Sequence, residues 1–492
     1  MKQTPRLKTN GSRPKANGAT GFCDFDKKEE CGVFGISSPD SQVALDIYSG
    51  LMALQHRGQE SSGIATFDGH GVRQTAAMGL TSQVFNEKKL QYLFGKTGIG
   101  HVRYSTTGSS SIENVQPFIF RAPTLTLAVA LNGNILNYEE LKDKLESKGH
   151  IFISTTDTEL IAHLLARELH GNANPDLFDA MKAVMEKLDG AYSILILTDK
   201  GQMCAVRDPK GFKPLCLGEK DGATIVSSET CGLDVLDAKF VREIEPGEMI
   251  VVNGSLESRR LFYESSHAHC MFEFVYFSRP DSVLEGQVVG EVRERLGQQL
   301  AKQCRAKLDV IVPIPDSGRS CALGFSKATG VPFSEGLVKN RYVWRTFIQP
   351  SDRMRKAALK LKLNPVRSVI AGKRVGLVDD SIVRGNTMTK VVKMLREAGA
   401  TEVHLLVSCP PVIAPCYMGV DFPTYKELLA ANHPVPEIEQ ILGVDSLTYM
   451  SIGGLVQAIG LPKEDLCMAC LTDEYPTKTN PKEKHHIATG SK

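Results

Sequence analysis

The segment VGLVDDSIVRGNT, residues 375–387, constrains the fold of this 492-residue chain more than any other segment does. Residues 375–378 are small or apolar, as in a buried strand, and they lead directly to Asp379 and Asp380. The polar loop that follows opens a stretch with apolar residues at helical spacing, namely Met388, Val391, Val392, Leu395 and Ala398. A strand, a polar loop and a helix in this order predict an open α/β sheet that binds its ligand where the strand ends.

The loop of this segment has the chemistry of a phosphate site. Its backbone N–H groups, the hydroxyls of Ser381 and Thr387, and the N-terminus of the following helix would all face an anion. The adjacent carboxylates of Asp379 and Asp380 can accept hydrogen bonds from ribose hydroxyls or hold Mg²⁺. The simpler interpretation is that both aspartates only cap the helix.

The rest of the chain shows two different patterns of predicted strands and helices. Residues 308–318 and 402–411 are apolar runs that end in polar loops, which predicts further parallel strands with crossover helices. Residues 31–256 contain shorter strands and two helical stretches, at 45–55 and 157–169, which predicts sheets with helices outside. The predicted divisions are a leader, a first domain, a second domain and a polar tail, at residues 1–30, 31–260, 261–474 and 475–492.

Composition excludes several classes of function. With 58 Lys and Arg against 56 Asp and Glu, the net charge of +2 predicts neither a nucleic-acid partner nor an anionic membrane partner. No apolar run is long enough to span a bilayer, and no secretory signal is evident, so we expect a cytoplasmic protein. Residues 1–23 are basic and lack acids, which also fits an organelle transit peptide.

The run VDDSIVRGNT resembles the signature of type I phosphoribosyltransferases, in the version found in the glutamine phosphoribosylpyrophosphate amidotransferase family. The resemblance implies that Asp379 and Asp380 contact ribose and Mg²⁺. The loop for the 5′-phosphate would then consist of Ser381, Ile382, Val383, Arg384, Gly385, Asn386 and Thr387.

Two more segments are similar to this family. IPDSG, residues 314–318, matches the pyrophosphate loop and implies that Ser317 lies near the metal, although by itself the sequence is only a turn. KNRYVWRTFIQP, residues 339–350, resembles the lid that closes over the substrate. The lid residues that would neutralise pyrophosphate are Lys339, Arg341 and Arg345.

CGVFGI, residues 31–36, is similar to the mature start of the N-terminal-nucleophile glutaminases, which are αββα sandwiches of the class II glutamine amidotransferases. The resemblance implies that cleavage removes residues 1–30 and leaves Cys31 as a nucleophile whose own α-amino group, with a pKa near ~8, is the base. It also implies that Arg57 supports this nucleophile. Without the resemblance, Cys31 would be a buried apolar residue at the start of a strand.

The same family assigns a glutamine pocket. LNGN, residues 131–134, matches the oxyanion hole, with the Asn132 side chain and the Gly133 N–H as donors. Arg103 would bind the α-carboxylate of glutamine and Asp157 its α-ammonium. Without the resemblance, Asn132 and Gly133 would be interpreted as a hairpin turn, Arg103 as a surface arginine and Asp157 as a helix cap.

Cys467 and Cys470 form a CxxC pair, which is half of a tetrahedral site. In the cluster-containing branch of the family, Cys270 and Cys416 match the other two ligand positions, which implies a 4Fe-4S cluster. Zinc also fits four thiols and stays open as an alternative.

The resemblance runs from Cys31 to about residue 476. It implies that ammonia from glutamine displaces diphosphate from phosphoribosyl pyrophosphate to give 5-phosphoribosylamine, the first step of purine synthesis. It further implies an ammonia path, a homotetramer and inhibition by purine nucleotides. Glucosamine-phosphate synthase and asparagine synthetase share only the first domain, and the loop at residues 375–387 argues against both.

The chain also departs from the family pattern at Leu131, Arg319, Ser320, Trp344 and Lys360. Leu131 stands where histidine is expected, and Trp344 where a small residue is expected. These departures keep open a catalytically weakened relative that senses nucleotides or acts as a scaffold.

Overall fold

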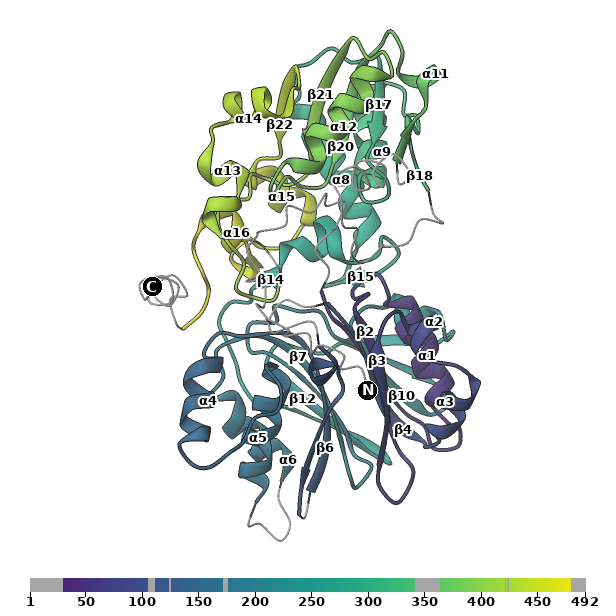
Figure 1. The fold of residues 1–492 in the computed structure, drawn as a ribbon, viewed down its shortest axis with the longest axis vertical. Coiled ribbons are helices and arrows are strands. Elements are labelled where there is room, and N and C mark those ends of the chain that lie inside the picture. Colours follow the sequence, from purple (N-terminus) through teal and green to yellow (C-terminus); the bar gives the residue numbers. More distant parts are fainter. Residues whose placement is uncertain are drawn as a thin grey trace, which may run out of the picture.

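The computed structural model describes residues 30–104, 111–123, 125–170, 176–340, 363–420, 422 and 424–478. Figure 1 shows two units stacked along the long axis of the molecule. The lower one, here called the two-sheet unit, contains β1 to β13, and the upper one, the parallel-sheet unit, contains β17 to β22. None of the helices in these ranges combines the length and the hydropathy needed to cross a membrane.

The first sheet of the two-sheet unit has seven strands, and the pairs between them are antiparallel. In spatial order they are β11 (Lys239–Glu243), β9 (Cys216–Lys220), β10 (Ala223–Ser227), β1 (Gly32–Ser37), β4 (Thr97–Arg103), β2 (Ser61–Phe67) and β3 (Val72–Met78). Its helices are α1 (Ala44–Ala53), α2 (Thr81–Val84), α3 (Glu87–Tyr92) and α7 (Cys231–Asp234). They pack on its outer face through a core that includes Phe34, Ile47 and Leu51.

The second sheet has six antiparallel strands. In spatial order they are β13 (Ser255–Arg260), β12 (Glu248–Asn253), β8 (Met203–Arg207), β7 (Gly190–Thr198), β6 (Leu125–Ile135) and β5 (Phe118–Ala122). Its outer helices are α4 (Tyr138–Glu146), α5 (Asp157–Leu169) and α6 (Leu177–Met185). A separate apolar cluster that includes Val33, Ile99 and Leu195 fills the space between the sheets. The unit is therefore the predicted αββα sandwich.

The parallel-sheet unit is built on four parallel strands in the order β17 (Val310–Pro313), β20 (Arg374–Asp379), β21 (Glu402–Val407) and β22 (Ser446–Tyr449). Its longer helices are α8 (Val289–Gln303), α9 (Gly318–Thr329), α12 (Asn386–Glu397), α14 (Val435–Leu442) and α15 (Ile452–Ile459). The shorter ones are α11 (Arg367–Ile370), α13 (Leu429–Asn432) and α16 (Ala469–Thr472). At the end of β17, Pro313 lies opposite Val378 of β20, and at the end of β20, Asp379 lies opposite Val407 of β21. The carboxyl ends of these strands therefore lie at the same edge of the sheet.

Three small strand pairs complete the described fold. They are β14 (His269–Cys270) with β23 (Leu466–Cys467), β15 (Val283–Leu284) with β16 (Gln287–Val288), and β18 (Leu337–Lys339) with β19 (Leu363–Pro365). The first pair joins the start of the parallel-sheet unit to its carboxyl end, because His269 and Cys270 lie opposite Leu466 and Cys467.

The predicted helices and strands are largely confirmed. The helix predicted at residues 157–169 is α5, and the one predicted at 45–55 is α1. The interpretation of Asn132–Gly133 as a hairpin turn is wrong, because β6 continues through both residues to Ile135 and pairs with β7 along this length.

Candidate active sites

The predicted nucleophile, Cys31, lies immediately before β1 and is nearly buried. β1 pairs with β4, whose last residue is Arg103, and the Cys31 Sγ donates a 3.5 Å hydrogen bond to the carbonyl oxygen of Tyr104. Burial raises the pKa of the Cys31 thiol, so the thiol needs a base before it can attack. The α-amino group of a chain beginning at Cys31 would be such a base.

The predicted oxyanion donors, Asn132 and Gly133, lie on β6, across from β4. His101 of β4 joins the two sheets here, because its Nε2 donates a 3.0 Å hydrogen bond to the carbonyl oxygen of Leu131. Burial lowers the pKa of His101 to about 3, so the ring is neutral. The buried Nδ2 of Asn132 has no hydrogen-bond partner within the described ranges, as expected of a donor that awaits an oxygen atom of a ligand.

Gly133 is held in a conformation that only glycine tolerates. Its φ is +151°, and an added Cβ would lie 2.0 Å from the carbonyl oxygen of Ala191 on β7. The backbone can therefore expose the Gly133 N–H without a side chain in the way.

Asp157 is the first residue of α5, and one of its carboxylate oxygens accepts a 2.8 Å hydrogen bond from the backbone N–H of Ile135. The other oxygen is buried and unpartnered in the described part of the chain. Burial raises the pKa of this carboxyl to about 7. An α-ammonium placed against this oxygen would satisfy it.

Arg103 is buried and forms an ion pair with Glu60 at 2.8 Å. Its backbone position beside Tyr104 places it next to the Cys31 thiol, and its predicted contact with the glutamine carboxylate stays a prediction. Residues 105–110, which follow it directly, lie outside the described residues.

The departure at Leu131 lies on the far side of the sheet from the site. Alternate side chains of β6 face opposite directions, and Leu131 packs with Leu127 and Val129 against the outer helices. Asn132 shares the other face, which Ala128 and Ala130 line between the sheets. Leucine at position 131 therefore does not touch the predicted oxyanion hole.

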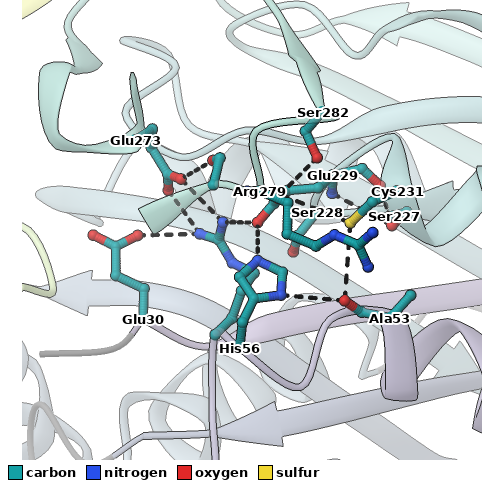
Figure 2. A network of polar contacts seen from close by, with 12 residues as sticks. Glu30, Ala53, His56, Ser227, Ser228, Glu229, Cys231, Glu273, Arg279 and Ser282 are labelled. Carbon is teal, nitrogen blue, oxygen red and sulfur yellow. Dashed lines mark hydrogen bonds and ion pairs between the residues drawn. The ribbon is translucent and has the colours of Figure 1, made fainter. Parts of the chain in front are cut away.

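Sequence reasoning predicted a role for Arg57 but missed the buried cluster of ionic side chains around it, of which Figure 2 labels Glu30, Glu229 and Glu273. It comprises Arg57, Lys213, Glu30, Glu229 and Glu273, and each of these side chains is at most 3% exposed. The Nε of Arg57 donates a 3.0 Å hydrogen bond to the carbonyl oxygen of Cys31. Apart from Arg57 and the charges before Cys31, the sequence carried no signal of this cluster, since its members are up to 243 residues apart, from Glu30 to Glu273.

In the parallel-sheet unit, the predicted pyrophosphate loop and the predicted signature meet at Asp380. Ser317 donates a hydrogen bond to one carboxylate oxygen of Asp380, and the Ser381 Oγ donates to the other at 2.7 Å. Asp379, at the end of β20, accepts a 3.0 Å hydrogen bond at its carbonyl oxygen from the N–H of Ser408.

The loop from Ser381 to Thr387 leads into α12, with Gly385 as the N-cap and Asn386 as the first helical residue. Ile382 is buried and Val383 is partly buried, so they anchor the loop to the core. Arg384 forms an exposed ion pair of 3.2 Å with Glu427.

Of the three predicted lid cations, Lys339, Arg341 and Arg345, only Lys339 lies in the described ranges, where its Nζ is 2.9 Å from Asp316 in the pyrophosphate loop. Arg319, one of the departures, lies 3.4 Å from the same Asp316, and its neighbour Ser320 is in α9. The residues outside the described part are Arg341, Trp344, Arg345 and Lys360.

The structure brings the four predicted cluster cysteines to one region at the border of the two units. Cys270 pairs in register with Cys467, and the carbonyl oxygen of Cys470 accepts hydrogen bonds from the segment that carries Cys416. Burial raises the pKa of all four thiols, so their thiolates require a nearby cation. Among the described residues, no group of three or more His, Cys, Asp or Glu is arranged to hold a metal ion.

One segment, residues 408–419, joins the two candidate sites. It begins at Ser408, beside Asp379 and Asp380, and it carries Cys416. It ends at Gly419, where an added Cβ would lie 3.2 Å from the carbonyl carbon of Gly133.

Comparisons with known proteins agree with this division. A family model of the glutamine amidotransferase domain matches residues 101–234, and one of the phosphoribosyl transferase domain matches residues 281–415. The amidophosphoribosyltransferase of Methanocaldococcus jannaschii is 52% identical over 467 residues, which cover 92% of this chain and 98% of the relative. The amidophosphoribosyltransferase of Bacillus subtilis is 45% identical, with coverage of 92% and 94%.

Two solved structures are also similar to this fold. One is described as the allosteric regulatory enzyme of purine biosynthesis and has a TM-score of 0.86 at 45% identity, covering 91% of this chain and 96% of the other. The second, glutamine phosphoribosylpyrophosphate amidotransferase of Bacillus subtilis in complex with ADP and GMP, has a TM-score of 0.85 at 44% identity, with coverage of 91% and 98%. The chain therefore belongs to the amidophosphoribosyltransferase family.

Proposed function

We propose a division of the family reaction between the two units, in which the two-sheet unit releases ammonia from glutamine and the parallel-sheet unit transfers it to phosphoribosyl pyrophosphate. The products are glutamate, diphosphate and 5-phosphoribosylamine, in the first step of purine biosynthesis. The observation that supports this proposal best is a pair of buried polar atoms, Asn132 Nδ2 and Asp157 Oδ1, that have no hydrogen-bond partner in the described part of the chain, in the same unit as the buried Cys31 thiol. Such atoms are costly unless a ligand satisfies them.

In the two-sheet unit, the Cys31 Sγ attacks the side-chain amide carbon of glutamine while the α-amino group of Cys31 takes the thiol proton. Asn132 Nδ2 and the Gly133 N–H stabilise the oxyanion that forms. Ammonia leaves, and water hydrolyses the γ-glutamyl thioester to glutamate. Arg103 and Asp157 select free glutamine by its carboxylate and ammonium groups.

In the parallel-sheet unit, the loop from Ser381 to Thr387 binds the 5′-phosphate, and Asp379 and Asp380 accept hydrogen bonds from the ribose hydroxyls. Ammonia attacks ribose C1, and diphosphate leaves toward Ser317 and Lys339. The carboxylates and the Ser317 hydroxyl are hard oxygen ligands that suit Mg²⁺. When bound, Mg²⁺ would neutralise the charge of the diphosphate.

We assign a 4Fe-4S cluster to Cys270, Cys416, Cys467 and Cys470. Each thiolate of such a cluster binds a different iron, so the thiols need not converge on one common ion. Cys270, Cys467 and Cys470 are buried and Cys416 is partly buried, and Lys213 adds a positive charge beside Cys270 and Cys416. The role of the cluster is structural, because the proposed reaction transfers no electron.

Further assignments concern processing and assembly. Residues 1–30 form a leader that is removed, residues 31–260 and 261–474 form the two domains, and residues 475–492 are a polar tail. The family resemblance also supports a homotetramer, and the ADP and GMP complex of the Bacillus subtilis relative supports inhibition by purine nucleotides.

Two measurements test the proposal. In a cluster-loaded, processed sample, diphosphate release should require both phosphoribosyl pyrophosphate and a nitrogen source, either glutamine or ammonium. Glutamate formation without diphosphate release would overturn the transfer reaction. The intact mass of active enzyme should correspond to a chain that begins at Cys31, and active enzyme that retains residues 1–30 would contradict the terminal-amine mechanism.

A further inference from the structure

A single guanidinium contacts both residues of the bond proposed for cleavage. The Nε of Arg57 donates to the carbonyl oxygen of Cys31 at 3.0 Å, and its Nη2 donates to a carboxylate oxygen of Glu30 at 3.2 Å. Lys213 donates to the other carboxylate oxygen of Glu30. The side chains of Arg57, Lys213 and Glu30 are fully buried. Glu30, the last residue of the leader, is therefore held in a defined position, although a segment that is only discarded would not need one.

The guanidinium of Arg57 is itself held from the other side. Its two Nη atoms donate to Glu273 at 2.6 and 3.0 Å, and Nη1 also donates to Glu229 at 2.6 Å. Figure 2 shows Glu30, Glu229 and Glu273 converging on this group. Because bidentate pairing fixes the plane of a guanidinium, Arg57 has little freedom to leave Glu30 and Cys31.

Glu229 and Glu273 are in turn held by the chain that leads into the parallel-sheet unit. Glu229 accepts hydrogen bonds from the Arg279 N–H at 2.9 Å and the Ser282 Oγ at 2.7 Å. Glu273 accepts one from the Ser278 Oγ at 2.5 Å. The position of Arg57 therefore depends on residues 273–282 being folded against the two-sheet unit.

We propose that Arg57 and Lys213 form a receptor for the Glu30 side chain, and that this receptor positions the Glu30–Cys31 peptide bond for cleavage. The proposal rests on the processing stated above. The Cys31 Sγ bonds to the carbonyl carbon of Glu30, the C–N bond breaks, and the thiol proton passes to the departing Cys31 nitrogen. Water then hydrolyses the thioester, which gives a carboxylate at Glu30 and restores the thiol.

The charge of the receptor also favours release of the leader after cleavage. Before cleavage, the carboxyls of Glu30, Glu229 and Glu273 outnumber the cations of Arg57 and Lys213 by one, and Glu229 has a further contact with the His56 Nε2 at 2.8 Å. Burial raises the pKa of Glu30 to about 8, as expected for the carboxyl left without a full counter-charge. Cleavage adds an α-carboxyl group to Glu30 and so raises the excess of carboxyls over the cations of Arg57 and Lys213 from one to two, whereas departure of the leader leaves the two carboxyls of Glu229 and Glu273 facing those two cations.

Variants within the leader test the receptor without changing the mature enzyme. Glu30→Ala removes the side chain that the receptor holds, and we expect cleavage of freshly synthesised chain to slow by about 10²-fold, as for a misplaced reacting group. Glu29→Ala removes the same charge one residue earlier and should be cleaved at the wild-type rate. Cleavage is followed by intact mass over time. Equal rates in all three chains, or equal slowing in both variants, would overturn the proposal.

Lys213→Met tests the receptor from the other side, with Lys210→Met as its control. Lys210 lies in the same loop and pairs with Glu264 at 3.4 Å, away from Glu30. Only Lys213→Met should retain residues 1–30. Iron and acid-labile sulfide are measured in both, because Lys213 also lies near Cys270 and Cys416. Slow cleavage at full iron content supports the receptor, and wild-type cleavage of Lys213→Met contradicts it.

A chain that starts with Met directly before Cys31 separates positioning from folding. Methionine aminopeptidase removes this Met, so Lys213→Met in that background needs no leader cleavage and should hydrolyse glutamine. If Lys213→Met in this chain fails to hydrolyse glutamine, Lys213 is needed by the glutaminase site of the mature enzyme, and the proposal that it acts only on the leader is overturned. If instead the wild-type precursor stays uncut while active, the proposed processing fails, an outcome distinct from failure of the receptor.

Discussion

The side-chain amide of Asn134 donates a 2.9 Å hydrogen bond to the carbonyl oxygen of Tyr417. Asn134 directly follows the predicted oxyanion donors on β6, and Tyr417 directly follows the predicted cluster ligand Cys416. Gly419, two residues further on, lies against the backbone of Gly133. The segment that begins beside Asp379 and Asp380 thus supports the backbone of the predicted oxyanion hole.

Substitution of Gly419 should disturb the oxyanion hole from the other unit. Gly419→Ala places a Cβ 3.2 Å from the carbonyl carbon of Gly133, at a residue whose φ is +97°. Since Gly133 is held in register with Tyr192 of β7, we expect kcat for glutamine hydrolysis to fall by about tenfold or more with little change in the KM for glutamine. Steady-state kinetics of glutamate formation measure this change.

Gly254→Ala is the matched control for backbone strain. Its φ is +74°, and an added Cβ there would meet nothing within 4 Å. Equal losses of activity in the two variants would mean that strain, and not contact with Gly133, is responsible.

Asn132→Ala should remove one oxyanion donor. We expect kcat with glutamine to drop by about 10²-fold to 10³-fold, because a preorganised donor acts mainly on the transition state. Diphosphate release with ammonium in place of glutamine should stay at the wild-type rate, since that reaction bypasses the two-sheet unit. An equal loss with both nitrogen sources would contradict the assignment of Asn132 to the glutamine reaction.

Local patterns predicted much of the fold because the relevant signals are local. The helix at residues 157–169 shows in the spacing of its apolar side chains, and the strand before Asp379 shows in its uninterrupted apolar run. The family resemblance implied that Ser317 lies near the metal that Asp379 and Asp380 would contact, and in the structure Ser317 donates a hydrogen bond to Asp380. Their positions at the ends of adjacent parallel strands explain why the two loops meet.

Contacts between segments that are distant in the sequence could not be predicted from local patterns. Nothing in the spacing of Glu30, Lys213 and Glu273 indicates that they share one buried site, because each is an ordinary charged residue in its local stretch. For the same reason Leu131 looked like a defect of the oxyanion hole, although the strand directs its side chain to the outer helices. Only the folded chain brings Glu30, Lys213 and Glu273 together, because they are far apart in the sequence.

Loss of one of the proposed cluster ligands should weaken both the fold at the border of the units and the glutamine reaction. In Cys467→Ser we expect iron and acid-labile sulfide to fall far below about four per chain, together with glutamine hydrolysis, because the Cys416 segment supports Gly133. Cys304→Ser, at a half-buried cysteine outside the four, should keep its iron. Stoichiometric zinc without sulfide in the wild-type protein would contradict the 4Fe-4S assignment.

Asp157 should make stability depend on pH in a defined direction. Burial raises the pKa of its carboxyl from 3.8 to about 7, so between these values the folded chain holds a proton that the unfolded chain has lost. The stabilising contribution is therefore complete below about pH 4 and is lost as the pH rises through about 7. Asp157→Asn stays neutral and can still accept from Ile135, so its free energy of unfolding relative to wild type should rise by up to about 4 kcal/mol over this window.

Denaturant unfolding at a series of pH values measures this difference, and Asp309→Asn is a control of opposite sign. The hydrogen bond from the Arg374 side chain lowers the pKa of Asp309 to about 2, so its stabilising contribution is present above about pH 4 and is lost as the pH falls. That variant should lose stability near neutral pH, where Asp157→Asn gains it. In the same Asp157→Asn chain the KM for glutamine should rise, because the α-ammonium loses its counter-charge. A stability difference that is flat from about pH 4 to about pH 8 would show that Asp157 is not held as a buried carboxyl awaiting a cation.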